Sequence, residues 1–450
     1  MLTGTLAAYD ELVPHPPRDE RLAGRLAALR DRRPAVDLAQ VGDVVIVVSS
    51  SRGGCTLLGE LLRRCRSLLA LPAESNPYVV VAQLGAADPS AVVAAELARV
   101  VGRPAEPPAD LEAYALEWAW RLCAQWPALE VPQADVERAV AAAATGREVL
   151  ASLCGRHAAI DERRYDGHSV QGLAGPTVEP VVEMPPFVVP RPWSLADEPA
   201  LRHLPLVLAT PRNAYRVRFL ASLFPRARVR ILHLVRNPAA AINGLIDGWQ
   251  HHGFFNCRVP RELAIAGYSD VHPWGRSWWK YDVPPDWETV ADAILPEVCA
   301  LQWRSAHEAS LAAIKDHGLE HHTVRYEDLV GPVSDRVAAA RALATWLGVP
   351  EDELVPIVAG GIDPVMATAP PRAGRWRVRE RELRAAVTDE RTLALAERLG
   401  YSGDWRLWPG DTVRALSRRP SAAATPGSDR PCHGFLSRAA PSARRSRRVS

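Results

Sequence analysis

A buried strand that runs into a glycine-containing turn constrains the fold of this chain more than any other feature. Residues 44–48 read Val-Val-Ile-Val-Val, and none of their side chains is polar. A strand that is apolar on both faces is typical of a parallel sheet covered by helices. An amphipathic helix begins at Thr56, after the turn, and its apolar face is formed by Leu57, Leu58, Leu61, Leu62 and Cys65. The pattern predicts a strand–turn–helix unit of an α/β protein.

The turn itself, Ser51-Arg52-Gly53-Gly54, has the chemistry of an anion site. Backbone N–H groups of such a turn and of the following helix N-terminus converge on one point. Arg52 can donate two parallel hydrogen bonds to one phosphate or sulfate group. We therefore expect a protein that binds a nucleotide phosphate or a sulfate. The alternative is a strand-to-helix turn that binds no ligand.

The order of residues in the turn argues against an ATP- or GTP-binding loop, which reads G-x-x-x-x-G-K-S/T. Here the basic residue precedes the glycines. The segment resembles the 5′-phosphosulfate loop of sulfotransferases that use 3′-phosphoadenosine 5′-phosphosulfate (PAPS), which commonly reads P-R-S-G-T-T-L-L. The positions that match are Arg52, Gly54, Thr56, Leu57 and Leu58, and those that differ are Ser51, Gly53 and Cys55.

A second segment, residues 231–249, resembles the 3′-phosphate-binding motif of the same family. That motif reads R-D/N-P, followed by a helix with a serine eight residues after the arginine. Arg236 ends an apolar strand, where open α/β sheets bind ligands. Gly244 stands at the position of the serine, and the neighbouring Asn243 is a candidate donor in its place. Without the resemblance, a salt bridge would be an equally good interpretation of Arg236.

Four shorter segments resemble the family in the same order along the chain. They are residues 209–213 with 223–225, the helix around Trp303, residues 325–329, and the loop Gly374-Arg375-Trp376-Arg377, which in the family folds over the donor's phosphates. The resemblance implies the sulfotransferase fold, an α/β fold with a central parallel sheet flanked by helices and related to nucleotide kinases. Ala209 stands where the family usually has a lysine, so Arg52 or another base such as Arg212 would have to supply that charge.

The pattern of apolar runs divides the chain into segments. We predict a polar leader over residues 1–42, a sulfotransferase domain over 43–408 and a disordered basic tail over 409–450. Within the domain, residues 86–203 form a helical and Pro-rich insertion, and residues 251–287 form an aromatic loop that is a candidate lining of the acceptor site. The further elements that we expect are strands at 205–209, 229–235 and 322–326 and helices at 213–223, 238–250, 297–315, 334–347 and 380–399.

The general base that would take the acceptor's proton is predicted to be Glu74. It lies 22 residues after Arg52, on the loop that follows the first helix and a short second strand. Several branches of the family place a catalytic glutamate in this region. His251 and His252 are the alternatives, because another branch uses a histidine. Cys55 is expected to pack and to offer its backbone N–H to the phosphate rather than to act as a nucleophile.

Charge and cysteine content limit the classes of partner and the cellular compartment that we expect. The tail, residues 411–450, holds nine arginines and two aspartates, a formal charge of +7, which leaves −5 for the rest of a chain whose total is +2. We therefore expect a small-molecule, glycan or lipid acceptor and no nucleic-acid partner. The seven cysteines are scattered without metal spacing and the first residues lack a secretory pattern, so we expect a cytoplasmic protein without a metal. No run of about 18 apolar residues predicts a membrane span. Lysine occurs only at Lys280 and Lys315, a skew that suggests a GC-rich genome, and we expect a bacterial protein.

Two other interpretations stay open at this point. A kinase-like nucleotide-binding enzyme of the same architecture would need a lysine in the turn and a metal-binding aspartate at a strand end, and neither is visible. A relative that binds nucleotide without catalysis would explain the residues found at positions 209 and 244. The acceptor and the oligomeric state are not predicted by the sequence.

Overall fold

The strand of residues 43–48, β1, lies in the middle of a parallel sheet, as its apolar sequence predicts. A computed structural model of the chain describes residues 28, 35–71, 94, 95, 97–99, 101–104, 193–250, 256–272, 275–361, 367–369 and 371–409, and the following account concerns these residues. The chain divides into two units, residues 1–414 and 415–450, and every described element belongs to the first.

The central sheet contains five strands within the described residues, and all of its pairings are parallel. From edge to edge the strands are β2 (Leu69–Ala70), β5 (Leu206–Ala209), β1 (Asp43–Val48), β6 (Arg228–Val235) and β9 (Glu320–Arg325). The chain passes from β5 on one side of β1 to β6 on its other side. Such a reversal of strand order creates a crevice at the carboxyl ends of the strands, where α/β proteins bind their ligands.

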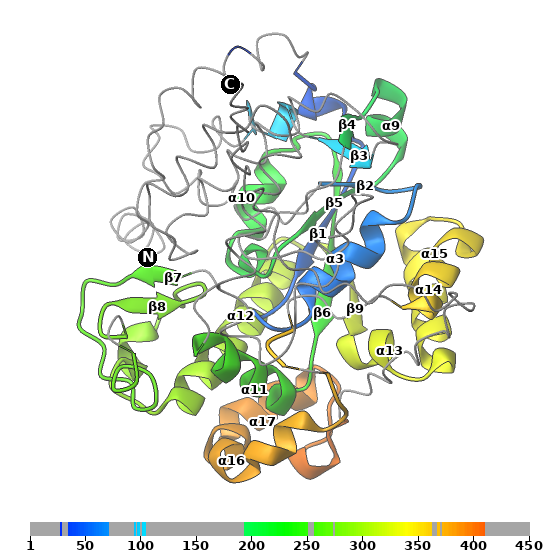
Figure 1. Cartoon of the computed structure of the whole chain (residues 1–450). Helices are drawn as coiled ribbons and strands as arrows, with labels where there is room; N and C mark the ends of the chain where they lie inside the picture. Colours follow the sequence, from blue (N-terminus) through cyan, green and yellow to red (C-terminus); the bar gives the residue numbers. More distant parts are fainter. Residues whose placement is uncertain are drawn as a thin grey trace, which may run out of the picture. The chain divides into compact units, whose positions relative to one another are not determined.

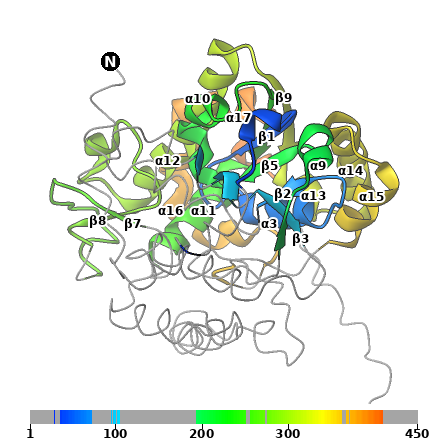
Figure 2. The ribbon, with the colours of Figure 1, turned by 90° about the horizontal axis from the view of Figure 1, so that it is seen from above.

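Helices cover both faces of this sheet, as the views in Figures 1 and 2 show. Alternate residues of β1 point to opposite faces, so Val44, Ile46 and Val48 belong to one apolar cluster and Val45 and Val47 to another. The helices on the first face include α9 (Glu198–His203), α10 (Val217–Ser222) and the end of α12 (Leu295–Asp316). Those on the second face are α3 (Cys55–Arg63), α13 (Tyr326–Val330), α14 (Val333–Leu347) and α15 (Glu351–Gly360).

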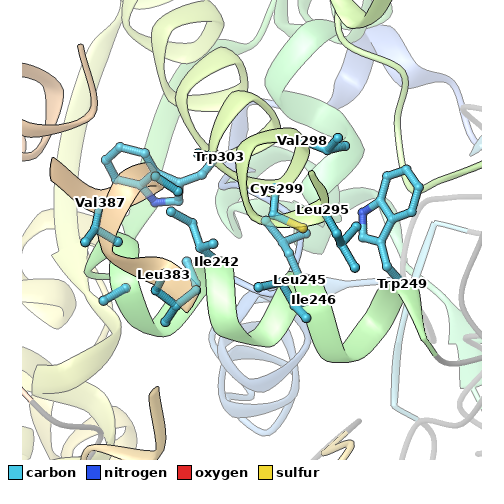
Figure 3. Close-up of a cluster of buried hydrophobic side chains, with 14 of the residues drawn as sticks. Ile242, Leu245, Ile246, Trp249, Leu295, Val298, Cys299, Trp303, Leu383 and Val387 are labelled. Carbon is cyan, nitrogen blue, oxygen red and sulfur yellow. The ribbon is translucent and has the colours of Figure 1, made fainter. Parts of the chain in front are cut away.

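A third apolar cluster lies beyond the carboxyl end of β6. It joins α11 (Pro238–Trp249) to α12 and to two C-terminal helices, α16 (Glu380–Thr388) and α17 (Glu390–Arg398). Figure 3 shows side chains of α11 between those of α12 and α16. The labelled residues are Ile242, Leu245, Ile246, Trp249, Leu295, Val298, Cys299, Trp303, Leu383 and Val387. This packing fixes α11 and α16 relative to each other.

Shorter elements complete the described structure. The 3₁₀ helices are η1 (Leu38–Gln40), η2 (Pro211–Tyr215), η3 (Trp287–Val290), η4 (Arg375–Arg379) and η5 (Trp405–Leu407). Two antiparallel ribbons pair β3 (Gly102–Pro104) with β4 (Trp193–Leu195) and β7 (Asn256–Arg258) with β8 (Trp278–Lys280). Leu38 and Val41 are buried in the first-face cluster, so the end of the predicted leader packs against the domain core.

The fold class and the expected strands and long helices are confirmed, with two differences in helix boundaries. The helix expected at 380–399 is broken at Asp389, which is extended and caps α17 by accepting a hydrogen bond from Thr392 N at 3.0 Å. A capping carboxylate satisfies an N–H that has no partner within the helix, so it begins a new helix. The helix expected at 213–223 is a 3₁₀ turn followed by α10, because Arg216 between them has a φ of −130° and a ψ of 16°, outside the helical range.

The described aromatic residues of 251–287 form part of the core. Tyr268 and Trp279 pack edge-on against Trp249 of α11, with ring centroids 4.7 and 5.1 Å away. All three are fully buried. Their rings thus stabilise the α11 cluster, and this packing does not bear on the acceptor. Across the described segments of the chain, no helix is long and apolar enough to cross a membrane.

Candidate functional site

The turn between β1 and α3 has an unusual backbone. Arg52 has a φ of 61° and Gly54 a φ of 101°, and Gly53 N donates to Ser50 O at 3.0 Å. Residues other than glycine rarely adopt positive φ, and such strain concentrates at binding sites. Gly54 caps α3, which begins at Cys55, and its carbonyl accepts the first helical hydrogen bond from Leu58 N at 3.0 Å. The turn therefore delivers Arg52 to the N-terminal end of α3.

Both glycines of the turn are in places where a side chain would not fit. A Cβ on Gly54 would lie 2.2 Å from Cδ2 of Tyr326, and a Cβ on Gly53 would lie 2.2 Å from Ser49 Oγ. The ring of Tyr326 thus closes one side of the turn. The sequence predicts the glycines for anion binding, and the structure adds close packing as a second reason for them.

Ser49 and Ser50 continue β1 into the turn and are fully buried. Among the described residues, neither hydroxyl has a hydrogen-bond partner. Buried polar groups are normally paired, and an unpaired one needs an explanation. Two buried hydroxyls next to a turn with positive φ fit an anionic group bound there, which they could reach as donors.

Arg236, which follows the last residue of β6, meets this turn. Its Nη1 donates to the carbonyl of Arg52 at 2.9 Å, and its guanidinium lies 4.4 Å above the centroid of the Tyr326 ring. Trp303 of α12 donates from Nε1 to the Arg236 carbonyl at 3.3 Å. The two arginines that the sequence singled out are thus in contact, although 184 positions separate them.

Gly244 of α11 faces the same two arginines. A Cβ at this position would lie 3.3 Å from Arg52 Cβ, 3.8 Å from Arg236 Nη1 and 3.9 Å from Arg52 Nε. The structure therefore places Gly244 beside both guanidinium-bearing side chains, where the family has a serine. Its neighbour Asn243 is buried, and its Oδ1 accepts a hydrogen bond from Arg379 Nη1 at 2.9 Å.

The start of α11 is fixed by a buried polar network. Asn237 caps the helix by accepting from Ala240 N at 2.9 Å, and its backbone N and Nδ2 both donate to Glu327 Oε1. Tyr401 donates to Glu327 Oε2 at 2.9 Å. Burial and the neighbouring Glu327 carboxylate raise the pKa of Tyr401 well above its ordinary value, so this phenol remains a donor. The network holds Arg236, the preceding residue, at the end of the sheet.

The C-terminal loop, predicted to cover the donor, lies against α11. Gly374, with a φ of 63°, is the N-terminal cap of η4, and Trp376 is buried in the α11 cluster. Arg375 Nη2 lies 2.5 Å from Asp247 Oδ2 of α11. Trp376 therefore anchors the loop through its side chain, while Arg375 lies on the side of α11 that bears Asp247.

Ala209 ends β5 at the same edge of the sheet and packs against α3, where a Cβ on Gly59 would lie 3.2 Å from its Cβ. The nearby base Arg212 is buried and donates from Nε to Asp282 Oδ1 at 2.9 Å. Arg216 donates to Asp282 Oδ2 at 2.7 Å. Burial raises the pKa of Asp282, but the two guanidiniums outweigh it and hold the pKa below its ordinary value. Arg212 therefore has a structural ion pair at the place where it could replace the missing lysine.

Glu74, His251 and His252 lie outside the described residues. The chain leading to Glu74 is described up to Leu71, whose carbonyl accepts a hydrogen bond from Arg63 Nε at 3.1 Å. The sequence did not single out Asp247 or Arg379. The available signal was the spacing of Asn243 and Asp247, which puts both on one face of a helix.

Comparison with known proteins agrees with this geometry. A profile of the sulfotransferase family matches residues 44–353, from the first residues of β1 to α15. The chain belongs to the sulfotransferase family. The match includes the turn of Arg52, the end of β6 at Arg236 and the helix that carries Gly244.

Two solved structures are similar to this sulfotransferase. The sulfotransferase domain from the curacin biosynthetic pathway has 15% sequence identity and a TM-score of 0.34, and the alignment covers 80% of this chain and 98% of that one. The sulfotransferase domain of the Synechococcus PCC 7002 olefin synthase has 14% identity and a TM-score of 0.34, with 82% and 97% covered. No curated protein matches the chain.

Proposed function

We propose that this sulfotransferase moves a sulfonate group from PAPS to a hydroxyl group of an acceptor. The observation that carries the proposal is that the side chains of Arg52 and Arg236 meet beside Gly244, at the carboxyl ends of β1 and β6: a Cβ on Gly244 would lie 3.9 Å from Arg52 Nε and 3.8 Å from Arg236 Nη1. Two guanidinium groups brought to one place favour an anion bound between or beside them. A donor with phosphate at both its 5′ and 3′ positions supplies two such anions.

The family membership and the geometry together suggest a role for each part of the site. Arg52 and the N–H groups from Ser51 to Thr56 would bind the 5′-phosphosulfate, together with the buried hydroxyls that lack partners. Arg236, with Asn243 and the loop 374–376, would bind the 3′-phosphate. PAPS would supply the sulfonate and a leaving phosphate, and these cations would stabilise the negative charge that collects there.

The acceptor's proton needs a base, and Glu74 remains our candidate. Transfer of a sulfonate between two oxygens resembles phosphoryl transfer, in which positioning and charge stabilisation provide most of the catalysis. Arg63 donates to the carbonyl of Leu71, the last described residue before Glu74. The acceptor class proposed is a hydroxyl of a sugar, a lipid or a secondary metabolite.

The proposal is tested by calorimetry with the donor product, adenosine 3′,5′-bisphosphate, and with ATP plus Mg²⁺. We expect metal-independent binding of the bisphosphate, tighter than that of ATP. In Arg236→Ala we expect the bisphosphate to lose affinity by about ten- to a hundredfold, the worth of a charge-assisted contact. The affinity for adenosine 5′-phosphosulfate, which has no 3′-phosphate, should hardly change.

The control variant is Arg381→Ala, which removes the same charge from an exposed position on α16. Tighter, Mg²⁺-dependent binding of ATP would contradict the proposal and favour a kinase-like enzyme. Binding of the bisphosphate without transfer of sulfonate from PAPS to any acceptor tested would favour a relative that binds nucleotide without catalysis.

A further inference from the structure

One face of α11 carries a network of polar side chains that was not part of the family resemblance. Asp247 accepts from Arg379 at Oδ1, and Arg375 lies 2.5 Å from its Oδ2. The same nitrogen of Arg379, Nη1, donates to Asn243 Oδ1 at 2.9 Å. Thr368 adds a hydrogen bond to Asp247 Oδ2 at 3.3 Å. The Asp247 side chain is 11% exposed, so these contacts are shielded from water.

The apolar core holds both sides of this polar network in place. Asn243 and Asp247 lie on α11, and Arg379 is the last residue of η4, directly before α16. Ile242 and Ile246 of α11 belong to the same cluster as Leu383 of α16, as Figure 3 shows. Because packed apolar side chains hold helices in one arrangement, the distance from Arg379 to Asn243 is set by the core and not by the arginine alone.

We propose that Asp247 is a positioning residue, which acts through Arg379 to turn Asn243 into the hydrogen-bond donor that replaces the serine missing at Gly244. This inference rests on the proposed binding of the donor's 3′-phosphate. It extends that proposal by naming the residues that make the site selective for a 3′-phosphorylated nucleotide.

The orientation of the Asn243 amide follows from the chemistry of its partner. A guanidinium donates hydrogen bonds and accepts none, so Oδ1 of the amide must face Arg379. The Nδ2 group, which has two N–H donors, then faces away from Arg379. Gly244, the next residue, lies beside Arg236 and Arg52. Neighbouring residues of a helix point about 100° apart, so the amide of Asn243 would reach a bound phosphate from the Arg379 side of the position that the serine occupies in the family.

Asp247 in turn fixes Arg379. An arginine side chain has many rotamers, and ordering it has an entropic cost that an anchoring carboxylate offsets. Asp247 accepts from Arg379, and its position one turn after Asn243 on the same helix face holds both partners of Arg379 in line. Without this carboxylate, Arg379 would lose the partner that holds Nη1 at the Asn243 oxygen, because its other carboxylate neighbour, Glu382 Oε2, lies 3.7 Å from Nε instead.

Positioning and simple electrostatics predict opposite results when Asp247 is neutralised. Asp247→Asn removes a negative charge beside the site, so electrostatics alone would strengthen binding of both nucleotides, and more so for the one with the extra phosphate. Loss of positioning would instead weaken the contact with that phosphate. The quantity to measure is therefore the ratio of the Kd of adenosine 5′-monophosphate to the Kd of adenosine 3′,5′-bisphosphate.

The experiment measures this ratio by calorimetry for the full chain and for Asp247→Asn, Arg379→Gln and Asn243→Ala. We expect the ratio to fall by about tenfold in each variant, the lower end of the range for a hydrogen bond to a charged group. In the double variant Asn243→Ala/Asp247→Asn the losses should not add, because both changes remove the same donor. Arg381→Gln is the matched control, an exposed arginine on α16, and should leave the ratio unchanged.

An unchanged or increased ratio in Asp247→Asn would overturn the inference, whatever the result for Arg379→Gln. Additive losses in the double variant would also overturn it, because Asp247 would then act separately from Asn243. If the unaltered protein binds the bisphosphate no better than the monophosphate, the proposed function fails instead. If Asp247→Asn does not fold, Arg379→Lys takes its place: it keeps the positive charge of a partly exposed side chain, so a fall in the ratio would report loss of positioning and an unchanged ratio would overturn the inference.

Discussion

The packing of Tyr326 against Gly54 provides the sharpest test of the turn geometry. Gly54→Ala introduces one methyl group, at a site where the φ is 101° and the ring carbon Cδ2 of Tyr326 would be 2.2 Å away. Both effects oppose folding. The same ring lies under the guanidinium of Arg236 at 4.4 Å, so its displacement should also disturb the anion site.

The expected loss of stability can be built from its parts. An alanine in the left-handed region costs about 1–2 kcal/mol, and overpacking of a tight site costs about 1–3 kcal/mol. Replacing glycine also restricts the unfolded chain, which returns about 0.4–1 kcal/mol. We therefore expect the free energy of unfolding to fall by about 1–5 kcal/mol, with most of the range set by how far the Tyr326 ring can move.

The assay is urea unfolding followed by fluorescence, with Gly348→Ala as the matched control. Gly348 ends α14 with a φ of 75°, and a Cβ there would meet no atom within 4 Å. The control therefore has the cost of an alanine at positive φ but no steric clash. We expect Gly54→Ala to lose at least about 1 kcal/mol more than Gly348→Ala, since overpacking adds at least that much, and to bind adenosine 3′,5′-bisphosphate more weakly.

The contact itself can be isolated with Tyr326→Ala. In the Tyr326→Ala background, Gly54→Ala should lower the free energy of unfolding only as much as Gly348→Ala does, because no ring remains to clash. Equal losses for Gly54→Ala and Gly348→Ala, or an extra loss that persists after Tyr326→Ala, would refute the reasoning that the ring closes the turn.

Three further predictions concern the rest of the chain. Burial lowers the pKa of His233 to about 4 and lowers the pKa of its partner His307, 2.9 Å away, well below the ordinary value. The unfolded chain therefore binds protons that the folded chain does not, and the free energy of unfolding falls as the pH drops below about 6.5. This free energy should differ between pH 7.5 and pH 5 by about 2 kcal/mol per histidine, and His307→Gln should reduce the difference. Glu74→Gln should keep the affinity for donor nucleotide and lower the transfer rate by about 10²–10⁴-fold, whereas retention of more than about a tenth of the rate would place the base elsewhere. A chain ending at Gly410 should keep its melting temperature, whereas one that also lacks the buried Trp408 should melt lower; a lower melting temperature in the first would contradict a dispensable tail.

Local sequence patterns predicted much of the fold, since each element depends on neighbouring residues. The apolar run at β1 could only form a buried strand, because a polar face was lacking. The helix expected at 334–347 is followed by Gly348, which ends α14 because glycine adopts positive φ without strain. The break at Asp389 was missed because a capping aspartate and an ordinary helical aspartate look alike until their N–H partners are known.

In the candidate site, too, the sequence determined some features and only the tertiary structure decided the others. The sequence by itself determined which residues carry charge at strand ends, and parallel strands bring their carboxyl ends to one edge, so Arg52 and Arg236 could be expected to meet. Only the tertiary structure decided that Tyr326 covers Gly54, that Arg212 is paired with Asp282, and that Asp247 joins Arg379 to Asn243. These contacts join segments far apart in the chain, and their geometry depends on how the helices pack, which no local pattern of residues encodes.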